Sequence, residues 1–463
     1  MSSRKRIALA ALACILGGSL TGPAYSQDET QAEVQVEPGG RPPGSADTTV
    51  DTRADDPQYA TLADTPPDQE APFGEKYYPV VTPGRRRPLM SLLDRAGLAE
   101  PLDEARIRIF GHVQGSYTHN FDDPALDLNL CRVFDIESNQ LLLNQIDLNV
   151  ERIVQLSDNN WDVGGRVEIM YGSDARFIHS TGLFDHHEDD GGILPGPENQ
   201  FDLTQAYVDV AVPVGSGLRL RAGKFLFFKQ VDPNASVFYS HSYTFGGALP
   251  FTLTGVSGFY ELNDEWSVEG GINRGWDESL EDTNSMISFH GRVRYSPTDR
   301  ASLALIFITG PEQPDNNGAY RTAIDLVGSF RATDRLTLMF DAVYGRQADP
   351  IDELLNTAAA GSEEADWFGL AGYAVYEVND HVSVAGRLEW FRDEEGFIPV
   401  TAVPQDLFEA TVGLTIRPFP NDDLGRNLKI RPEVRYDWST EDFFDGLTSD
   451  NQFTAAVDVI FNF

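Results

Sequence analysis

From Arg106 to the last residue, apolar side chains recur at every second position, and this alternation constrains the fold more than any other feature. In the segment 428–438, Leu, Ile, Pro, Val, Tyr and Trp alternate with Lys, Arg, Glu, Arg and Asp. Successive side chains of a β-strand point to opposite faces, so each such segment predicts a strand with one apolar and one polar face. We count about 16 such segments and no long helical pattern between them, which argues against a parallel α/β fold. The segments begin near Arg106, Leu141, Trp161, Gln205, Leu218, Phe251, Trp266, Ser285, Ala301, Arg321, Arg335, Asp366, His381, Leu407, Leu428 and Gln452.

The length of these segments indicates whether lipid or water surrounds the strands. They run for about ten residues, as tilted membrane strands do, whereas strands of soluble proteins are about 5–6 residues long. A soluble β-sandwich also alternates, but only a closed barrel encloses its polar face around a wet interior. Charges of both signs lie on that polar face in mid-strand, and we predict that they line a pore: Arg108, Asp147, Glu151, Arg166, Glu168, Arg219, Arg221, Arg292, Arg294, Arg387, Glu389, Arg431, Glu433 and Arg435.

The connections between the segments alternate in length. Short turns such as 158–160 and 263–264 are followed by longer loops such as 172–203 and 310–320. Membrane barrels have short turns on one rim and long loops on the other, so we predict a single closed antiparallel transmembrane β-barrel over residues 106–463. Aromatic residues near the strand ends are expected to form interfacial girdles on the lipid side. They are Tyr117, Trp161, Tyr171, Trp266, Tyr295, Tyr344, Trp367, Trp390, Tyr436 and Trp438.

The composition agrees with this interpretation. The 463 residues include 72 Asp and Glu against 35 Lys and Arg, a net charge of -37 that opposes binding to nucleic acid. The mean hydropathy of -0.30 is too low for a bundle of membrane helices, but a barrel exposes only alternate residues to lipid. Two cysteines in a chain of this length exclude a disulfide scaffold.

The N-terminal part of the chain differs from the rest. Three basic residues at 4–6, an apolar run at 7–20 and the small-x-small motif at 24–26 predict a signal peptide over residues 1–26. An anchored N-terminal helix and a lipoprotein modified at Cys14 are the alternatives. Residues 27–88 are acidic and rich in proline, which predicts a disordered periplasmic linker. Helical spacing of apolar residues predicts a short amphipathic helix and a lead-in to the barrel at 89–105.

The loop at 229–250 is the candidate constriction of the pore. It combines aromatic residues with Gly246-Gly247, where the chain can bend sharply. The alternative is an outer loop that packs only on its neighbours. The other long loops are acidic, as at Asp122-Asp123 and Glu441-Asp442, which favours a mild cation preference. The aromatic residues of the candidate constriction are Phe238, Tyr239, His241, Tyr243 and Phe245.

Three motifs carry a resemblance to a known family. The segment 273–277 reads Asn-Arg-Gly-Trp-Asp, the segment 431–437 reads Arg-Pro-Glu-Val-Arg-Tyr-Asp, and the chain ends in Phe461-Asn462-Phe463. With these motifs, residues 106–463 resemble the OmpL-like "putative beta-barrel porin-2" family of bacteria with an outer membrane. The resemblance implies passive diffusion of small hydrophilic solutes or ions across the outer membrane, with no cofactor. It also implies that assembly machinery recognises Phe461 and Phe463, and porins of this size suggest a homotrimer.

Two other functions are the alternatives. A structural barrel would anchor the envelope or carry an adhesin, and an outer-membrane enzyme would need a catalytic site. The sequence lacks the G-x-S-x-G, Walker and H-E-x-x-H motifs, and the best hydrolytic pair, Ser288 and His290, is of a kind that arises often by chance. The His- and Asp-rich segment 185–190 has no metal-ligand spacing and predicts a solvated loop. We therefore predict no catalytic residues and no metal site.

Overall fold

The computed structural model describes residues 87–124, 126–156, 160–185, 196–228, 231, 233–352, 357–358, 363–398 and 403–463. For 351–352 and 357–358 it describes only the backbone. The predicted signal peptide at 1–26 and almost all of the predicted linker at 27–88 lie outside these residues, as do residues 186–190 of the acidic loop.

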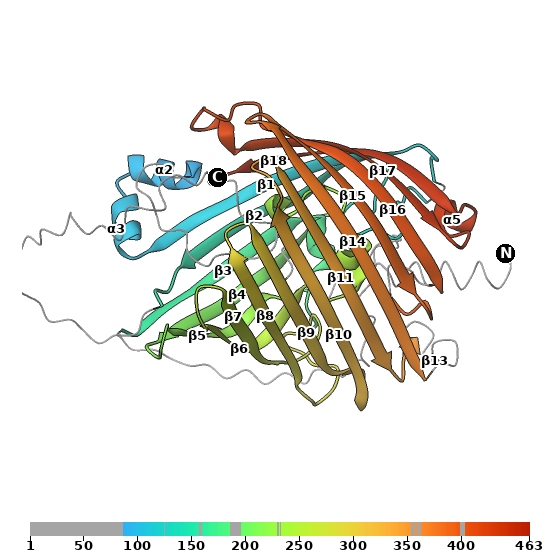
Figure 1. Cartoon of the computed structure of the whole chain (residues 1–463), viewed down its shortest axis with the longest axis horizontal. Helices are drawn as coiled ribbons and strands as arrows, with labels where there is room; N and C mark the ends of the chain where they lie inside the picture. The colour runs from blue at the N-terminus through green and yellow to red at the C-terminus, as the bar shows by residue number, and fades with distance from the viewer. Residues whose placement is uncertain are drawn as a thin grey trace, which may run out of the picture.

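Sixteen strands form one closed barrel, which confirms the predicted fold (Figure 1). Around the barrel the strands follow the order β1-β18-β17-β16-β15-β14-β11-β10-β9-β8-β7-β6-β5-β4-β3-β2, and neighbouring strands pair antiparallel. β12 (Ile351–Asp352) and β13 (Thr357–Ala358) form a separate two-stranded sheet. The barrel strands are β1 (Ile107–Asn120), β2 (Leu141–Arg152), β3 (Asp162–Gly172), β4 (Gln200–Val212), β5 (Leu218–Leu226), β6 (Thr252–Glu261), β7 (Trp266–Asn273), β8 (Ser288–Thr298), β9 (Ala301–Gln313), β10 (Asn316–Arg331), β11 (Leu336–Ala348), β14 (Glu364–Asn379), β15 (Val382–Asp393), β16 (Gln405–Ile416), β17 (Leu428–Ser439) and β18 (Asn451–Asn462).

The strand positions agree closely with the alternation in the sequence. The largest differences occur at β4, which begins at Gln200 rather than near Gln205, and at β10, which begins at Asn316 rather than near Arg321. The predicted loop at 310–320 is wrong, because β9 and β10 extend through it and leave only residues 314–315 between them. The connection between β9 and β10 is therefore a short turn and not one of the long outer loops.

The two faces of each strand have different surroundings. On β18, Phe453 and Val459 are exposed on the outside, whereas Thr454 and Asp458 are buried on the inside. The outer side chains are apolar because they face lipid, and the inner polar side chains bond to one another or to loops. Trp367 departs from the predicted girdle: it is fully buried on the inner side, and its Nε1 donates to the carbonyl oxygen of Ala248 at 3.3 Å.

Short helices flank the barrel at both ends. α2 (Pro88–Arg95) begins with Pro88, whose fixed φ suits the first helical turn, and ends before Gly97, which has a left-handed φ of 73°. With α3 (Ala99–Glu104) it lies at the same end as the C-terminus, while α5 (Phe444–Leu447) lies at the opposite end (Figure 1). None of the helices in the described part of the chain is long and apolar enough to cross a membrane.

Candidate pore constriction

The connection between β5 and β6 covers residues 227–251, and its described residues 227–228, 231 and 233–251 fold into the barrel and bond to the wall on the other side. In the closed strand order β5 and β6 face β15 and β16 across the interior. The connection includes α4 (Tyr243–Gly247), which begins where the Ser242 hydroxyl accepts a hydrogen bond from the amide of Phe245 at 3.2 Å. We call residues 227–251 the inner loop.

Two buried carboxylates hold the backbone of the inner loop. Glu433 on β17 accepts hydrogen bonds from the amides of Tyr239 at 2.8 Å and Ser240 at 3.0 Å. Glu389 on β15 accepts in the same way from the amides of Tyr243 and Thr244, both at 2.8 Å. Each carboxylate thus takes two adjacent amides, which supplies the hydrogen bonds that a buried charge requires.

Arginines of the same wall hold the carbonyl groups of the inner loop. Each of these arginines also forms an ion pair with a carboxylate of the wall, so the donors are fixed in place. The distances from guanidinium nitrogen to carbonyl oxygen are 2.6–2.9 Å, and the pairs are Arg387 with Ser240, Arg431 with Pro233 and Ser236, and Arg435 with His241.

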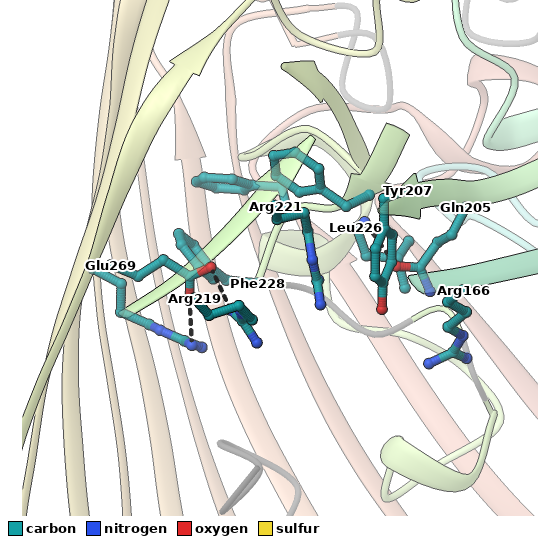
Figure 2. A pocket seen from close by; sticks show the side chains of 11 residues that line it. Arg166, Gln205, Tyr207, Arg219, Arg221, Leu226, Phe228 and Glu269 are labelled. Atoms are coloured by element: carbon teal, nitrogen blue, oxygen red, sulfur yellow. Dashed lines mark hydrogen bonds and ion pairs between the residues drawn. The ribbon is translucent and has the colours of Figure 1, made fainter. Parts of the chain in front are cut away.

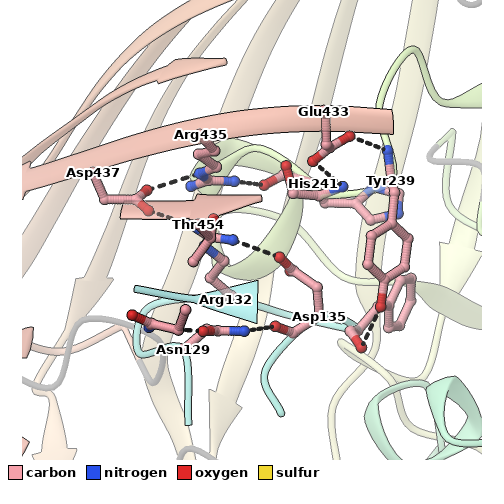
Figure 3. A network of polar contacts seen from close by, with 12 residues as sticks. Asn129, Arg132, Asp135, Tyr239, His241, Glu433, Arg435, Asp437 and Thr454 are labelled. Atoms are coloured by element: carbon pink, nitrogen blue, oxygen red, sulfur yellow. Dashed lines mark hydrogen bonds and ion pairs between the residues drawn. The ribbon is translucent and has the colours of Figure 1, made fainter. Parts of the chain in front are cut away.

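A second connection, residues 121–140 between β1 and β2, also reaches the interior (Figure 3). The guanidinium of Arg132 donates to Asp135 at 2.7 Å, to Thr454 on β18 at 2.9 Å and to Asp437 on β17. Arg435 donates to the other oxygen of Asp437 at 2.8 Å. One carboxylate thereby joins the wall to the 121–140 connection.

The two connections pack against each other through apolar side chains. Phe134 is buried and contacts the ring of Phe245 at 5.8 Å and that of Phe251 at 6.0 Å between centroids. Cys131 lies in the same buried cluster, and burial raises the pKa of its thiol. A protonated, covered thiol is a poor nucleophile, so Cys131 has a packing role.

The predicted constriction aromatics all lie on the inner loop, but they differ in exposure. Phe238, Tyr239 and Tyr243 are buried against the wall, and the hydroxyl of Tyr239 accepts a hydrogen bond from Ser116 at 2.7 Å. His241 and Phe245 are only partly buried and stack with ring centroids 4.0 Å apart. These last two rings are the least covered of the five predicted constriction aromatics.

The predicted pore-lining residues fall into separate groups. The inner loop covers one group, and a second, arginine-rich group surrounds a recess near the start of that loop. Arg108 and Glu151 form a further group. They pair at 2.7 Å, near the rim of the barrel that carries the short turns. The covered group is Arg387, Glu389, Arg431, Glu433 and Arg435. The recess group is Arg166, Arg219, Arg221 and Arg292. Asp147 and Glu168 are buried on the same inner face, and Arg294 donates to Ser302 at 3.2 Å.

Some anchoring residues were missing from the sequence-based set. Asp437 and Asp458 share the inner face with Arg435 and Arg431, so the same alternation indicates them. Arg132 lies in a loop, where alternation gives no signal.

Ser288 and His290 bond to different partners: the Ser288 hydroxyl donates to Glu312 at 2.7 Å, and His290 bonds to Asn273 at 3.0 Å. Within the described ranges, no group of three or more His, Cys, Asp or Glu side chains is arranged to hold a metal.

Comparisons with known proteins agree with this architecture. Residues 106–463 match the model of the family described as "Putative beta-barrel porin-2, OmpL-like". Among solved structures, the anion-selective porin from Comamonas acidovorans is similar with a TM-score of 0.52 and 11% identity, over 77% of this chain and 99% of that chain. OprB of Pseudomonas putida is similar with a TM-score of 0.50 and 12% identity, over 80% and 97%. The search of curated proteins found no match. The match of the family model to the entire barrel region shows that the chain is an outer-membrane β-barrel belonging to the OmpL-like porin-2 family.

Proposed function

We propose that this chain is a passive porin through which small hydrophilic solutes and ions diffuse, and that the inner loop is its constriction. The observation that carries the proposal is the attachment of residues 227–251 to the opposite wall through Glu389 and Glu433. Sixteen-stranded barrels enclose an aqueous channel, and an anchored loop narrows it to a fixed size. The proposal contains no catalytic step.

The test is the conductance of the purified barrel in planar bilayers, together with swelling of liposomes in sugars and amino acids of graded size. Wild-type protein is expected to conduct, and deletion of residues 236–247 to raise the single-channel conductance. A deletion of the exposed residues 421–423, in the turn between β16 and β17, is the control and should leave the conductance unchanged. Absence of conductance and swelling in the wild type would contradict the porin and favour a structural barrel. An unchanged conductance in the loop deletion would exclude the inner loop as the constriction.

We propose a mild cation preference on the basis of the outer loops. Asp122, Asp123, Glu441 and Asp442 are exposed there, and a ring of carboxylates concentrates cations at a pore mouth. The inner arginines oppose this effect, which is why the preference is expected to be mild. The reversal potential in a KCl gradient measures it: replacing these four acids by their amides should move the potential toward the anion side. An anion-selective wild type would contradict the proposal.

We further propose that the barrel forms a homotrimer and depends on the assembly machinery of the outer membrane. Exposed apolar residues of the outer wall, such as Val167 and Leu388, supply a surface that lipid or a second copy can cover. Native mass spectrometry of the protein in detergent measures the number of copies directly. A monomer under conditions that preserve conductance would contradict the trimer.

A further inference from the structure

Arg321 lies near the start of β10, on the inner face that it shares with the buried Asp325. Its guanidinium carbon lies 5.0 Å from the ring centre of Trp276 and 5.2 Å from that of Phe397. Trp276 belongs to the connection between β7 and β8, and Phe397 to the connection between β15 and β16. Two loops from separate parts of the wall therefore meet at one arginine, close to the turn between β9 and β10.

Buried carboxylates hold both rings in place through the backbone. Glu312 near the end of β9 accepts a hydrogen bond from the amide of Trp276 at 2.8 Å, and Asp393 at the end of β15 accepts from the amide of Phe397 at 3.0 Å. The fully buried Trp367 packs against both rings, with centroid distances of 6.4 Å to Trp276 and 6.0 Å to Phe397. The aromatic frame around the guanidinium is thus fixed by the fold.

The guanidinium of Arg321 is bonded at only one of its nitrogens. Its Nε donates to the side-chain oxygen of Gln347 at 2.7 Å, and the amide group of Gln347 donates in turn to the carbonyl oxygens of Ala319 at 3.1 Å and Ala348 at 2.8 Å. Within the described part of the chain, Nη1 and Nη2 of Arg321 have no hydrogen-bond acceptor and no ion-pair partner. The group is therefore oriented but not satisfied.

Other arginines of the inner wall bond directly to a carboxylate. Glu269 accepts from Arg219 at 3.0 Å, for example, beside the recess at the start of the inner loop (Figure 2). Glu312 interacts electrostatically with Arg321, but one of its oxygens accepts from the Ser288 hydroxyl at 2.7 Å and the other from the backbone amide described above. The terminal nitrogens of Arg321 thus remain available to a solute.

We propose that Arg321, framed by Trp276 and Phe397, binds the carboxylate of a small solute at the long-loop end of the pore. Rings over the flat faces of a guanidinium leave its N–H groups at the edge, where Nη1 and Nη2 form a fork that matches two carboxylate oxygens. The rings beside this fork provide apolar contact for the rest of the solute. The solute class is thus a monocarboxylate with a hydrocarbon body.

The site is open toward the barrel interior. Arg321 and the two rings of its frame are partly exposed, whereas Trp367 and Gln347, which contact them from the wall, are fully buried. A solute that enters between the outer loops reaches Arg321 from the interior. The inference rests on the proposed porin function, because the bound solute is one that passes through the barrel.

The test uses cyclohexanecarboxylate as the probe, with cyclohexanecarboxamide as its neutral analogue and inorganic phosphate as a different oxyanion. Binding is measured by block of the single-channel current and, in detergent, by the change in tryptophan fluorescence, since Trp276 contacts Arg321. We expect the carboxylate to produce both signals in a concentration-dependent way, the carboxamide to produce neither, and phosphate to require a higher concentration.

Substitutions assign these signals to one side chain. Arg321→Gln should raise the half-saturating concentration of the carboxylate about tenfold, the value of one lost charged hydrogen bond. Arg321→Lys keeps the charge but loses the planar fork, and its affinity should lie between those of the wild type and Arg321→Gln. The control is Arg346→Gln on β11, because Arg346 lies opposite Thr322 in the strand register, on the outer face of the barrel, and is 43% exposed. It should bind as the wild type does.

The outcomes separate the site from the porin function. Equal responses to the carboxylate and the carboxamide, tighter binding of phosphate, or equal effects of Arg321→Gln and Arg346→Gln would overturn the carboxylate site while the channel still conducts. If Arg321→Gln yields no folded barrel, Arg321→Lys decides: affinity equal to the wild type overturns the fork. A fluorescence response without any single-channel current would instead contradict the porin function and leave the site standing.

Discussion

At the scale of single residues, charged side chains on one face of the barrel have two different surroundings. Glu433 and Arg431 are buried beneath the inner loop, where they bond to its backbone. Arg292 lies on the same type of inner face, but it is partly exposed to the interior. A position on the polar face of a strand therefore does not by itself decide whether a charge anchors a loop or meets a solute.

The anchoring contact of Glu433 predicts a specific loss. Glu433→Gln leaves only one carbonyl oxygen for the amides of Tyr239 and Ser240, so one buried amide loses its partner. We expect the free energy of unfolding to fall by about 1–3 kcal/mol. We also expect a larger and noisier single-channel conductance, because the inner loop is held less firmly. Urea unfolding in detergent and bilayer recording measure the two effects.

The matched control is Glu151→Gln, which makes the same chemical change on the inner wall at the pair with Arg108, closer to the short-turn end. It should leave the conductance noise unchanged, because exposed or partly exposed pairs contribute little. If Glu433→Gln and Glu151→Gln behaved alike, Glu433 would have no special role in holding the inner loop.

The sequence predicted the faces of these residues but not their partners. Alternation is a local property, so the inward direction of Arg387 or Glu433 follows from a few neighbouring residues. The bond between Arg132 and Asp437 joins residues 305 positions apart, and no local pattern encodes it. The same limit explains why Trp367 was placed on the lipid side: its burial depends on the inner loop, which brings Ala248 to its indole.

At the scale of elements, the hairpin of β9 and β10 shows how a connection can be predicted too long. Residues 310–320 are polar and contain proline, which is typical of a loop. The turn itself needs only Pro314 and Asp315, where proline fixes one φ and Asp315 adopts a left-handed φ of 55°. The flanking polar residues belong to β9 and β10 and not to the turn, which is why the connection is short.

The connection between β7 and β8 is expected to respond to pH through Glu278. This side chain is 3% exposed, one of its oxygens accepts from the amide of Thr283 at 3.2 Å, and the other is buried near Glu312. Burial and the neighbouring carboxylate raise the pKa of Glu278 from its ordinary value of 4.5 to about 8. Because the folded pKa is raised, stability is greatest below 4.5 and is lost as the pH rises toward 8.

The measurement is limited proteolysis of the exposed Leu280 in this connection at pH 6 and pH 9. We expect cleavage of the wild type to be roughly a hundredfold faster at pH 9, because about two pH units separate pH 6 from the folded pKa, and Glu278→Gln to remove that difference. The control, Glu281→Gln, changes an exposed neighbouring residue and should keep the difference in cleavage rate between pH 6 and pH 9. Cleavage that rises equally in all three proteins would show that the pH acts on the protease or elsewhere in the chain.

At the scale of the whole molecule, the barrel closes between the first and last strands. β1 pairs with β18 from His112 opposite Asn462 to Asn120 opposite Thr454. Phe463 extends this seam, since its amide and carbonyl each bond to Gly111 at 2.9 Å. The residue that resembles an assembly signal in the sequence is therefore also the last residue to join the two ends of the sheet.

These two roles of Phe463 make separable predictions. Deleting Phe463 removes two hydrogen bonds at one end of the seam, each worth about 0.5–1.5 kcal/mol, and leaves the rest of the β1–β18 pairing intact. Refolding into detergent should therefore remain possible, with only a modest loss of stability.

If assembly machinery reads the terminal aromatic residue, the amount of folded barrel in the outer membrane should instead fall several-fold, as measured by fractionation and heat-modifiable mobility. Phe453→Ala, an outward residue at the other end of β18, is the control. Parallel losses in detergent and in the cell would assign Phe463 to the seam alone, and unchanged levels in both would remove it from either role.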